Sequence, residues 1–371
     1  MTERANQPLI LVLGAGASLG ARARCATLPP LGCGLGKYLL DWLDANEPRD
    51  ELTSDFPLTA GERLWHESLL PKLREELNGV IGQESPSVDE TLTPFEVLMD
   101  KWTKREDGHR ILIAMQTLLA YAFLVGHRCA FHEHLDLLDR LVRGLPRERP
   151  LIVITLNYDL LLEEAFLRDD QRFTYPAVPG VEKTIFFSEG HGEPTPVYKI
   201  HGSINWLSVR SPGSADPEVA RRATEPVKVE ERNGLLVTQT YATYVPPNRE
   251  SLFLELERST GTPVAAVYGT GKPVVENAEP VDAHRRDCLA RIARLVEGDA
   301  LVIGVRHVGE DDDPVLDEVL RAIAKLDGEK TYVNPSDDDC RHFERLGYGT
   351  VAKTLEDWLD VWPHRQAPDT Q

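Results

Sequence analysis

The chain has 371 residues, of which 42% are hydrophobic and 27% are charged, and its formal net charge is −19. This composition is typical of a soluble globular protein, and no apolar run approaches the length of a membrane span. Because contacts with phosphates require Lys and Arg, so acidic a chain is a poor general binder of nucleic acid. We therefore expect neither direct nucleic-acid binding nor a membrane partner.

The cysteines are scattered, odd in number and never arranged as CxxC. They are Cys25, Cys33, Cys129, Cys288 and Cys340. This pattern argues against a disulfide framework and against a four-cysteine zinc site, so we expect no metal and no zinc. The first residues, MTERANQPLI, lack the basic segment and apolar core of a secretion signal, and we expect a cytoplasmic protein.

Residues 8–13 form an apolar segment that predicts a strand, and the glycine-containing motif GAGAS follows it at residues 14–18. Glycines after a first strand let the backbone turn tightly, and the amides at the next helix N-terminus can then meet a pyrophosphate. As one short motif, GAGAS is equally compatible with an ordinary tight turn between a strand and a helix.

A helix is predicted at residues 35–46, and residues 47–147 then have a uniformly helical character. Their apolar residues recur at spacings of three and four, which is typical of amphipathic helices. We interpret 47–147 as an all-helical insertion. His132 and His134 within it are two residues apart and do not share a helix face, so with His127 they are better explained as surface or packed histidines than as a metal site.

The segment LIVITLNYDLLLEEAF, at residues 151–166, predicts a buried strand, a short polar turn and a helix. Ligands bind at the carboxyl ends of strands in an open parallel sheet, so Asn157, Tyr158 and Asp159 are expected at that edge. The Asn157 side chain supplies both a donor and an acceptor. Asp159 has an alternative role at the start of its own helix, where Asp is common.

A third short strand is predicted at residues 196–200, and HGSINW follows it. His201 can act as a general base near neutral pH. Ser203 and Asn205 are candidates for the pocket lining, whereas Trp206 fits the core better. On its own, Asn157 or His201 is better explained as an ordinary turn residue, but several such groups converging on one edge favour a site.

The remaining chain predicts an exposed loop at 208–231, a strand pair at 235–245 and a flexible excursion at 261–280. Further elements follow: a helix at 283–297, a buried strand at 299–305, a helix opened by Pro314 and a last core strand at 331–334. Asp313 is in the N-cap position of the helix that Pro314 opens. The acidic run at 310–313 is interpreted as a solvated helix start rather than a cation site.

Strands and helices alternate at both ends of the chain, which predicts an α/β fold with a Rossmann-like parallel sheet flanked by helices. The all-helical subdomain interrupts this sheet. We assign residues 1–46 and 148–364 to the Rossmann-like core, 47–147 to the helical insertion and 365–371 to a disordered tail.

The motifs GAGAS, TLNYD and KIHGS, in this order, resemble the sirtuin-like (silent-information-regulator-type) family. TLNYD is similar to the segment that carries the catalytic Asn of that family, and KIHGS to the segment that carries its catalytic His. The resemblance implies that NAD is the substrate and that Asn157 and His201 are catalytic. It implies NAD-binding roles for Gly14, Ala15, Gly16, Ala17, Ser18, Asp159, Gly202, Ser203, Gly304 and Asn334.

Several departures from deacylating sirtuins argue against protein deacylation. The four-cysteine zinc module and the AGIPDFR loop are missing, and the Ser expected after Gly304 is replaced, because the chain reads Val305-Arg306-His307 there. The chain looks more like the bacterial, NAD-hydrolysing branch of anti-phage defence. By resemblance, it is an NAD glycohydrolase (NAD+ nucleosidase) that cleaves NAD to ADP-ribose and nicotinamide and depletes NAD in the infected cell.

Two alternatives remain open. One is an NAD-dependent protein deacylase or ADP-ribosyl transferase, and the other is a non-enzymatic regulator that binds NAD or ADP-ribose. For partners, we expect a homo-oligomer, and the resemblance suggests a separate partner such as a HerA-type ATPase or an Argonaute. The helical insertion is the expected contact region.

Overall fold

The computed structural model describes residues 7–17, 35–46, 70–81, 114–115, 118–119, 122, 136–176, 193–208, 229–232, 235–238, 242–244, 262–265, 268–269, 272–273, 279–306 and 313–362. Several predictions lie outside these residues: those on Ser18, on the histidines at 127, 132 and 134, on the acidic residues 310–312 and on the tail at 365–371.

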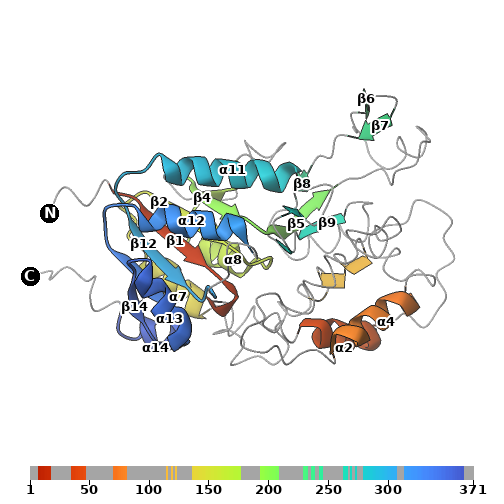
Figure 1. Cartoon of the computed structure of the whole chain (residues 1–371), viewed down its shortest axis with the longest axis horizontal. Coiled ribbons are helices and arrows are strands. Elements are labelled where there is room, and N and C mark those ends of the chain that lie inside the picture. Colours follow the sequence, from red (N-terminus) through yellow and green to blue (C-terminus); the bar gives the residue numbers. More distant parts are fainter. Residues whose placement is uncertain are drawn as a thin grey trace, which may run out of the picture.

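A seven-stranded parallel sheet with helices around it lies in the half of the molecule nearest the two termini (Figure 1). Its strands are β1 (Leu9–Leu13), β2 (Leu151–Thr155), β3 (Phe173–Thr174), β4 (Thr195–Lys199), β12 (Asp299–Ile303), β13 (Lys330–Val333) and β14 (Gly349–Val351). The spatial order is β14-β13-β12-β1-β2-β4-β3, and every neighbouring pair is parallel. The predicted Rossmann-like sheet is therefore confirmed.

The central strands are apolar throughout because both of their faces are covered. All residues of β1 are buried, with Leu9, Leu11 and Leu13 on one face and Ile10 and Val12 on the other. A strand buried on both faces appears as a continuous apolar run rather than as an alternating pattern. This is why β1 and β2 were recognisable in the sequence.

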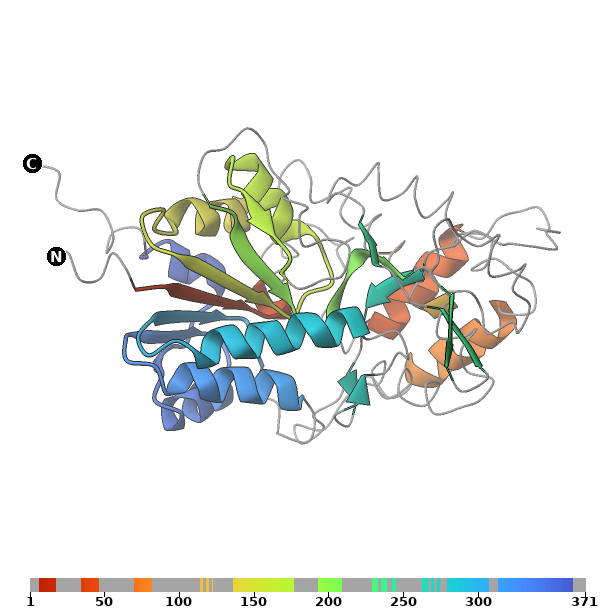
Figure 2. The ribbon, with the colours of Figure 1, turned by 90° about the horizontal axis from the view of Figure 1, so that it is seen from above.

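Helices cover both faces of the sheet. On one face α7 (Asp136–Gly144), α8 (Leu161–Arg168) and α14 (Leu355–Leu359) share an apolar core with the strands. On the other face the core is shared by α11 (Glu279–Ala293), α12 (Pro314–Ala324) and α13 (Asp337–Arg345). Seen from above, α11 and α12 lie side by side on one side of the sheet (Figure 2).

Side chains at the helix starts fix where three of these helices begin. The side chain of Asp313 accepts a hydrogen bond from the Leu316 amide and caps α12, as predicted, with Pro314 in the first turn. Ser336 caps α13 and Thr354 caps α14 in the same way. Asp313 follows β12 in the chain and Ser336 follows β13, so both capping residues lie at the edge where these strands end.

Two helices outside the sheet layers lie in the first part of the chain. They are α2 (Leu35–Asn46), which confirms the predicted helix, and α4 (Leu70–Ile81). They pack on each other, and Arg74 Nε lies 3.0 Å from Asp44 Oδ1. By contrast α7, although within the predicted insertion range of 47–147, packs against α8 and α14 in the core. The domain boundaries stay predictions.

Short antiparallel strands follow the sheet strand β4. A three-stranded sheet has the order β8-β5-β9, formed by β5 (Gly202–Ser208), β8 (Ala242–Tyr244) and β9 (Thr262–Ala265). Two hairpins are β6 (Val229–Arg232) with β7 (Leu235–Thr238), and β10 (Tyr268–Gly269) with β11 (Lys272–Pro273). The predicted pairing within 235–245 is therefore wrong, because β7 pairs with β6 while β8 pairs with β5. The predicted excursion at 261–280 contains β9, because β5 provides its partner edge.

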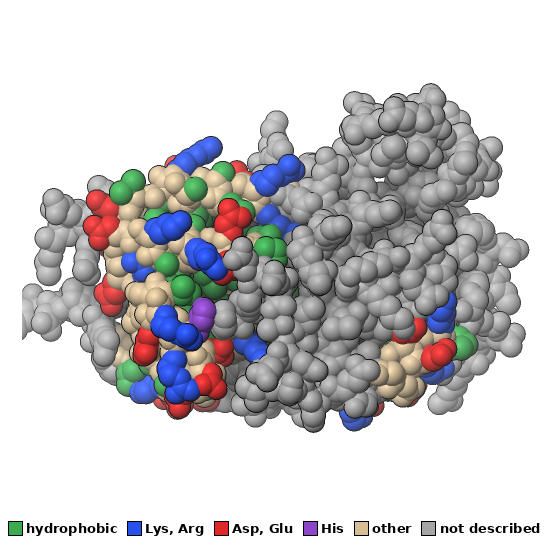
Figure 3. All heavy atoms as spheres, viewed as in Figure 1, with side chains coloured by type: hydrophobic (Ala, Val, Ile, Leu, Met, Phe, Trp, Pro, Cys, Tyr) green, Lys and Arg blue, Asp and Glu red, His purple; other side chains and the backbone are tan. Residues whose placement is uncertain are grey.

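None of the helices in the described ranges combines the length and the apolarity that a membrane crossing needs. On the face of the core shown in Figure 3, Lys and Arg side chains are interspersed with Asp and Glu side chains among the described residues.

Candidate active site

The order of the sheet strands reverses beside β1. The chain passes from β1 to β2 on one side, and β12 later joins β1 on the other. In open parallel sheets, the crevice at the carboxyl ends of two such strands is where ligands bind. Here that edge carries the glycine motif after β1 and Gly304 after β12.

The glycines at this edge are required by the close approach of two loops. The amides of Gly14 and Gly16 donate to the carbonyls of Ile303 (2.9 Å) and Gly304 (3.0 Å), and the Ala17 amide donates to the Gly14 carbonyl (3.0 Å). Gly304 has a φ of +63°, and a Cβ there would lie well inside van der Waals contact with the Ala17 nitrogen. These contacts explain the glycines without any ligand. They also bring the two predicted nucleotide-binding segments together.

Asn157 joins the second predicted segment to the first. It follows the end of β2, and its Nδ2 donates to the carbonyl oxygen of Gly14 (3.1 Å). Its backbone N–H donates to Thr155 Oγ1 (3.1 Å), which fixes the turn, and the side chain is half-buried. The TLNYD turn and the GAGAS turn are therefore in direct contact.

His201 follows the end of β4 and pairs with Asp313. Its Nε2 lies 2.7 Å from Asp313 Oδ2, with side-chain exposures of 14% and 7%. Burial acts to raise the pKa of Asp313, but the charge and hydrogen bond of His201, the Leu316 amide and Arg285 outweigh it, and the net pKa is lowered. Asp313 is thus a carboxylate at neutral pH, and His201 Nε2–H is the donor in this pair.

A buried arginine supports the same cluster. Nε of Arg285, on α11, donates to the carbonyl of Ile200, the residue before His201. Burial lowers the pKa of Arg285 to about 9, whereas the charge of Asp313 acts to raise it, so the guanidinium stays protonated at neutral pH. No sequence pattern predicted Asp313 or Arg285 as a site residue. Asp313 was recognised only as a helix cap, and no local pattern marked Arg285.

Tyr158 directly follows Asn157 in the sequence, and its ring lies near that of His201. Its ring centroid is 6.3 Å from that of His201, with the planes tilted by 36°. Its carbonyl accepts the amide of Ile204 on β5 (3.2 Å). The turn after β2 is therefore held against the segment that follows His201.

Asp159 stabilises the start of its own helix, which was one of the two roles predicted for it from the sequence. Its Oδ1 accepts the amide of Leu161 (3.1 Å), the first residue of α8. Its carbonyl accepts a hydrogen bond from Lys199 Nζ. The carboxylate thus stabilises the start of α8, and an additional contact of Asp159 with NAD stays a prediction.

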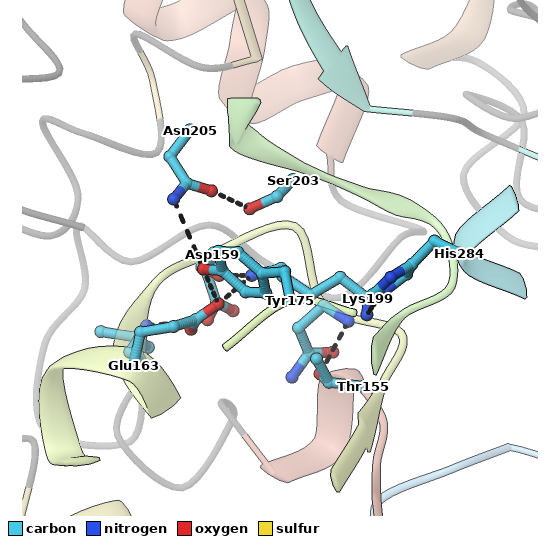
Figure 4. A network of polar contacts seen from close by, with 10 residues as sticks. Thr155, Asp159, Glu163, Tyr175, Lys199, Ser203, Asn205 and His284 are labelled. Carbon is cyan, nitrogen blue, oxygen red and sulfur yellow. Dashed lines mark hydrogen bonds and ion pairs between the residues drawn. The ribbon is translucent and has the colours of Figure 1, made fainter. Parts of the chain in front are cut away.

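Ser203 and Asn205 lie in a buried polar network behind this edge (Figure 4). Ser203 Oγ donates to Asn205 Oδ1 (2.5 Å), and Asn205 Nδ2 donates to the Tyr175 hydroxyl (3.4 Å). Gly202, with a φ of +83°, provides the turn between His201 and β5. Both polar side chains are fully buried, and through the Tyr175 hydroxyl they connect β5 to Glu163 on α8.

Asn334 follows β13 and ties two loops together. Its Nδ2 donates to the Val305 carbonyl (2.9 Å), and its Oδ1 accepts the Ser336 amide (2.9 Å). It therefore lies at the same carboxyl edge, beside Gly304. The predicted contact with the adenine ribose remains a prediction.

Within the described ranges, no group of three or more His, Cys, Asp or Glu side chains is arranged to hold a metal ion. Cys288 and Cys340 are buried free thiols, and burial is the largest cause that raises the pKa of each. The other cysteines lie outside the described residues.

The carboxyl edge of the sheet thus combines the amide side chain of Asn157, the His201–Asp313 pair and the glycines at the point where the strand order reverses.

Residues 151–244 match the model of a family described as the SIR2-like domain, and this range includes both Asn157 and His201. A comparison with curated proteins finds no match. SIR2-like domains use NAD, so the match points to an NAD-related function in general. Residues 151–244 are therefore similar to a SIR2-like domain, in agreement with the sirtuin-like resemblance of TLNYD and KIHGS, which both lie in this range.

Proposed function

We propose that this protein is an NAD glycohydrolase that cleaves NAD to ADP-ribose and nicotinamide. The observation that carries the proposal is the approach of Asn157 and the His201–Asp313 pair to one edge, beside the strand-order switch at Gly14 and Gly304. The SIR2-like match supports NAD as the substrate in general terms.

The reaction breaks the bond between nicotinamide and ribose through an oxocarbenium-like ribose. Nicotinamide leaves as a neutral molecule, so the leaving group needs no acid. Water supplies the oxygen of the new hydroxyl, and one proton is released. The protein must therefore hold the ribose, direct the water and accept a proton.

Asn157 is proposed to orient the water and the ribose hydroxyls. Its Nδ2 donates to the Gly14 carbonyl, and this bond fixes the plane of the amide. The amide oxygen then offers an acceptor in a fixed direction. A fixed acceptor favours one approach of the water, which is the positional contribution that this reaction needs.

His201 is proposed to act as the general base. Because Nε2–H donates to Asp313, the proton from water or from a ribose hydroxyl goes to Nδ1. The Asp313 carboxylate then stabilises the imidazolium that forms. The same carboxylate holds the imidazole in one tautomer and one orientation, as in other His–Asp pairs.

Binding of the remaining parts of NAD is proposed from position and resemblance. The turn at Ala15–Ala17 begins a helix, and a helix N-terminus favours the negative charge of a pyrophosphate. Asn334 lies further along the same edge, where the sirtuin-like resemblance expects the adenine ribose.

The test is NAD turnover by the purified protein, with ADP-ribose and nicotinamide resolved by chromatography. Asn157→Ala and His201→Ala are expected to lose cleavage while they keep the fold. His342→Ala, a half-buried histidine on α13, is the matched control and is expected to keep full activity. NAD-dependent removal of an acyl group from a peptide would instead favour the deacylase alternative. Binding of NAD without cleavage, also in the presence of a candidate partner, would favour the regulator.

We further propose that NAD depletion serves anti-phage defence, and that the protein acts as a homo-oligomer or with a separate partner. The support is the resemblance to the defence branch and the amphipathic helical periodicity in the sequence of residues 47–147. Light scattering of the full chain gives its mass in solution. A monomer mass in the wild type, unchanged by a HerA-type ATPase or an Argonaute, would count against both assemblies.

A further inference from the structure

A fully buried ion pair lies directly beneath the turn that carries Asn157. Lys199 is the last residue of β4, and its Nζ lies 2.8 Å from Oε1 of Glu163 on α8. The side-chain exposures are 0% and 1%. Figure 4 shows the two side chains meeting below Asp159.

The pair belongs to a continuous chain of hydrogen bonds. The Tyr175 hydroxyl donates to Glu163 Oε1 (2.9 Å), and Asn205 Nδ2 donates to that hydroxyl. On the other side of the strand, the Lys199 amide donates to Nε2 of His284 (2.8 Å). Lys199 is therefore held through both its side chain and its backbone, so its position at the strand end is fixed.

Stability alone does not account for this arrangement. Two buried charges lose their hydration, and apolar residues of similar volume are often equally stable in such a place. Moreover, Glu163 Oε2 accepts no hydrogen bond within the described residues. In some proteins, buried ion pairs are retained for the geometry that they impose rather than for stability.

Lys199 contacts the turn that carries Asn157. Its Nζ donates to the carbonyl of Asp159, two residues after Asn157, and Lys199 itself stands two residues before His201. The Tyr158 carbonyl in the same turn is held by the amide of Ile204. The lysine thus connects the segment of Asn157 with the segment of His201.

We propose that Lys199, oriented by Glu163, is a positioning residue that fixes the Asn157 turn relative to His201. It acts through the Asp159 carbonyl and does not touch the substrate. The inference rests on the proposed NAD cleavage, which requires both side chains at one ribose.

The decisive variant is Lys199→Met, which keeps the length of the side chain and removes the charge. We expect kcat for NAD cleavage to fall about tenfold to hundredfold, as small misplacements of reacting groups do, with KM within about twofold. The variant Glu163→Gln should also have a lower kcat than the wild type. The double variant Lys199→Met/Glu163→Gln should recover thermal stability, because no unpaired charge remains, but not kcat.

Arg149→Met is the matched control. Arg149 forms a partly buried pair with Asp299 (2.8 Å) at the opposite, amino-terminal end of the sheet. We expect this variant to lose stability and to keep kcat. If Arg149→Met and Lys199→Met lower kcat in proportion to their loss of stability, Lys199 has only a structural role and the proposal is overturned.

Hydrogen exchange supplies a readout that does not depend on activity. The amides of Leu161 and Ile204 bond to Asp159 Oδ1 and to the Tyr158 carbonyl, and both should exchange faster in Lys199→Met. The amides of β1 should exchange faster only to the extent that the global stability falls, and less than those of Leu161 and Ile204. Exchange at Leu161 and Ile204 that is accelerated no more than in β1 would overturn the positioning role. Absence of NAD cleavage by the wild type, also in the presence of a candidate partner, would overturn the proposed function instead.

Discussion

His201 Nε2 lies 2.7 Å from Asp313 Oδ2, and the two residues are 112 positions apart in the chain. The same carboxylate caps α12, because its Oδ1 accepts the Leu316 amide at 3.0 Å. Asp313 therefore connects the start of a helix to the proposed general base. A residue with two separable roles allows each role to be tested alone.

Asp313→Asn should lower kcat for NAD cleavage while it preserves the fold. Asn is as good an N-cap as Asp, so the start of α12 should be kept, and any larger loss in the free energy of unfolding should come from the missing charge beside His201 and Arg285. The amide cannot stabilise an imidazolium, so we expect kcat to fall about 100-fold. Steady-state kinetics and urea unfolding measure the two effects.

Ser336→Ala, which removes the cap of α13, is the control. It should lower the free energy of unfolding by about 1 kcal/mol and leave kcat unchanged. Full activity of Asp313→Asn would exclude the carboxylate from the mechanism.

Asn157→Asp should also remove activity. The substitution keeps the size of the side chain but places a carboxylate oxygen against the Gly14 carbonyl, where Nδ2 now donates. The side chain must then turn away, and we expect NAD cleavage to fall about 100-fold or more. Asn78→Asp is the matched control, because Asn78 Nδ2 also donates to a backbone carbonyl, that of Arg74, at an exposed position of α4. Equal activity of both variants would argue against a catalytic role for Asn157.

Gly304→Ala should destabilise the protein more than Gly347→Ala. Both glycines have a positive φ, but a Cβ at Gly347 meets nothing within 4 Å, whereas one at Gly304 would collide with the backbone of Gly16 and Ala17. The backbone conformation alone costs about 1–2 kcal/mol for Ala. The collision should bring the cost at Gly304 to about 3 kcal/mol or more. Urea unfolding of both variants measures the difference, and equal costs would mean that the two loops separate easily.

Stability should fall between pH 7 and pH 5 because of His284. Burial is the main cause that lowers the pKa of His284 to about 4, although a bond to the Pro176 carbonyl and the charge of Asp287 oppose it and Lys199 adds to it. Nε2 accepts the Lys199 amide, so the buried imidazole is neutral with its proton on Nδ1. The unfolded chain binds a proton near pH 6.5, which the folded chain does not. Stability is therefore lost as the pH falls, by about 2 kcal/mol from pH 7 to pH 5.

His284→Gln removes the titrating group and keeps an acceptor for the Lys199 amide. Its free energy of unfolding should depend less on pH in this range, as measured by urea unfolding at both pH values. Asp313 does not disturb the comparison, since its lowered pKa makes its contribution disappear only at more acidic pH. The same pH dependence in both proteins would place the effect elsewhere.

The strands of the core were predictable from local pattern. Strand β1 appears as an apolar run because both of its faces are covered, and α12 begins at Asp313 because Asp followed by Pro is a local helix-start signal. Asn157 and His201 were predictable as edge residues, since each directly follows a buried strand in a parallel sheet. The contact of Asn157 with Gly14 then followed from the adjacency of β1 and β2.

The tertiary structure alone decided which of these residues are partners. The strand pairing of β5 with β8 and β9 joins segments that are distant in the sequence, and no local pattern encodes such a pairing. For the same reason the sequence could mark Asp313 as a cap but not as the partner of His201. Lys199 at a strand end also had no visible partner, because Glu163 reaches it only after α8 has packed on the sheet. Periodicity and helix capping depend on residues that are close in the sequence, so they can be recognised locally. The two charge pairs form only when the helices have packed on the sheet and have excluded water from the side chains, so the sequence does not reveal them.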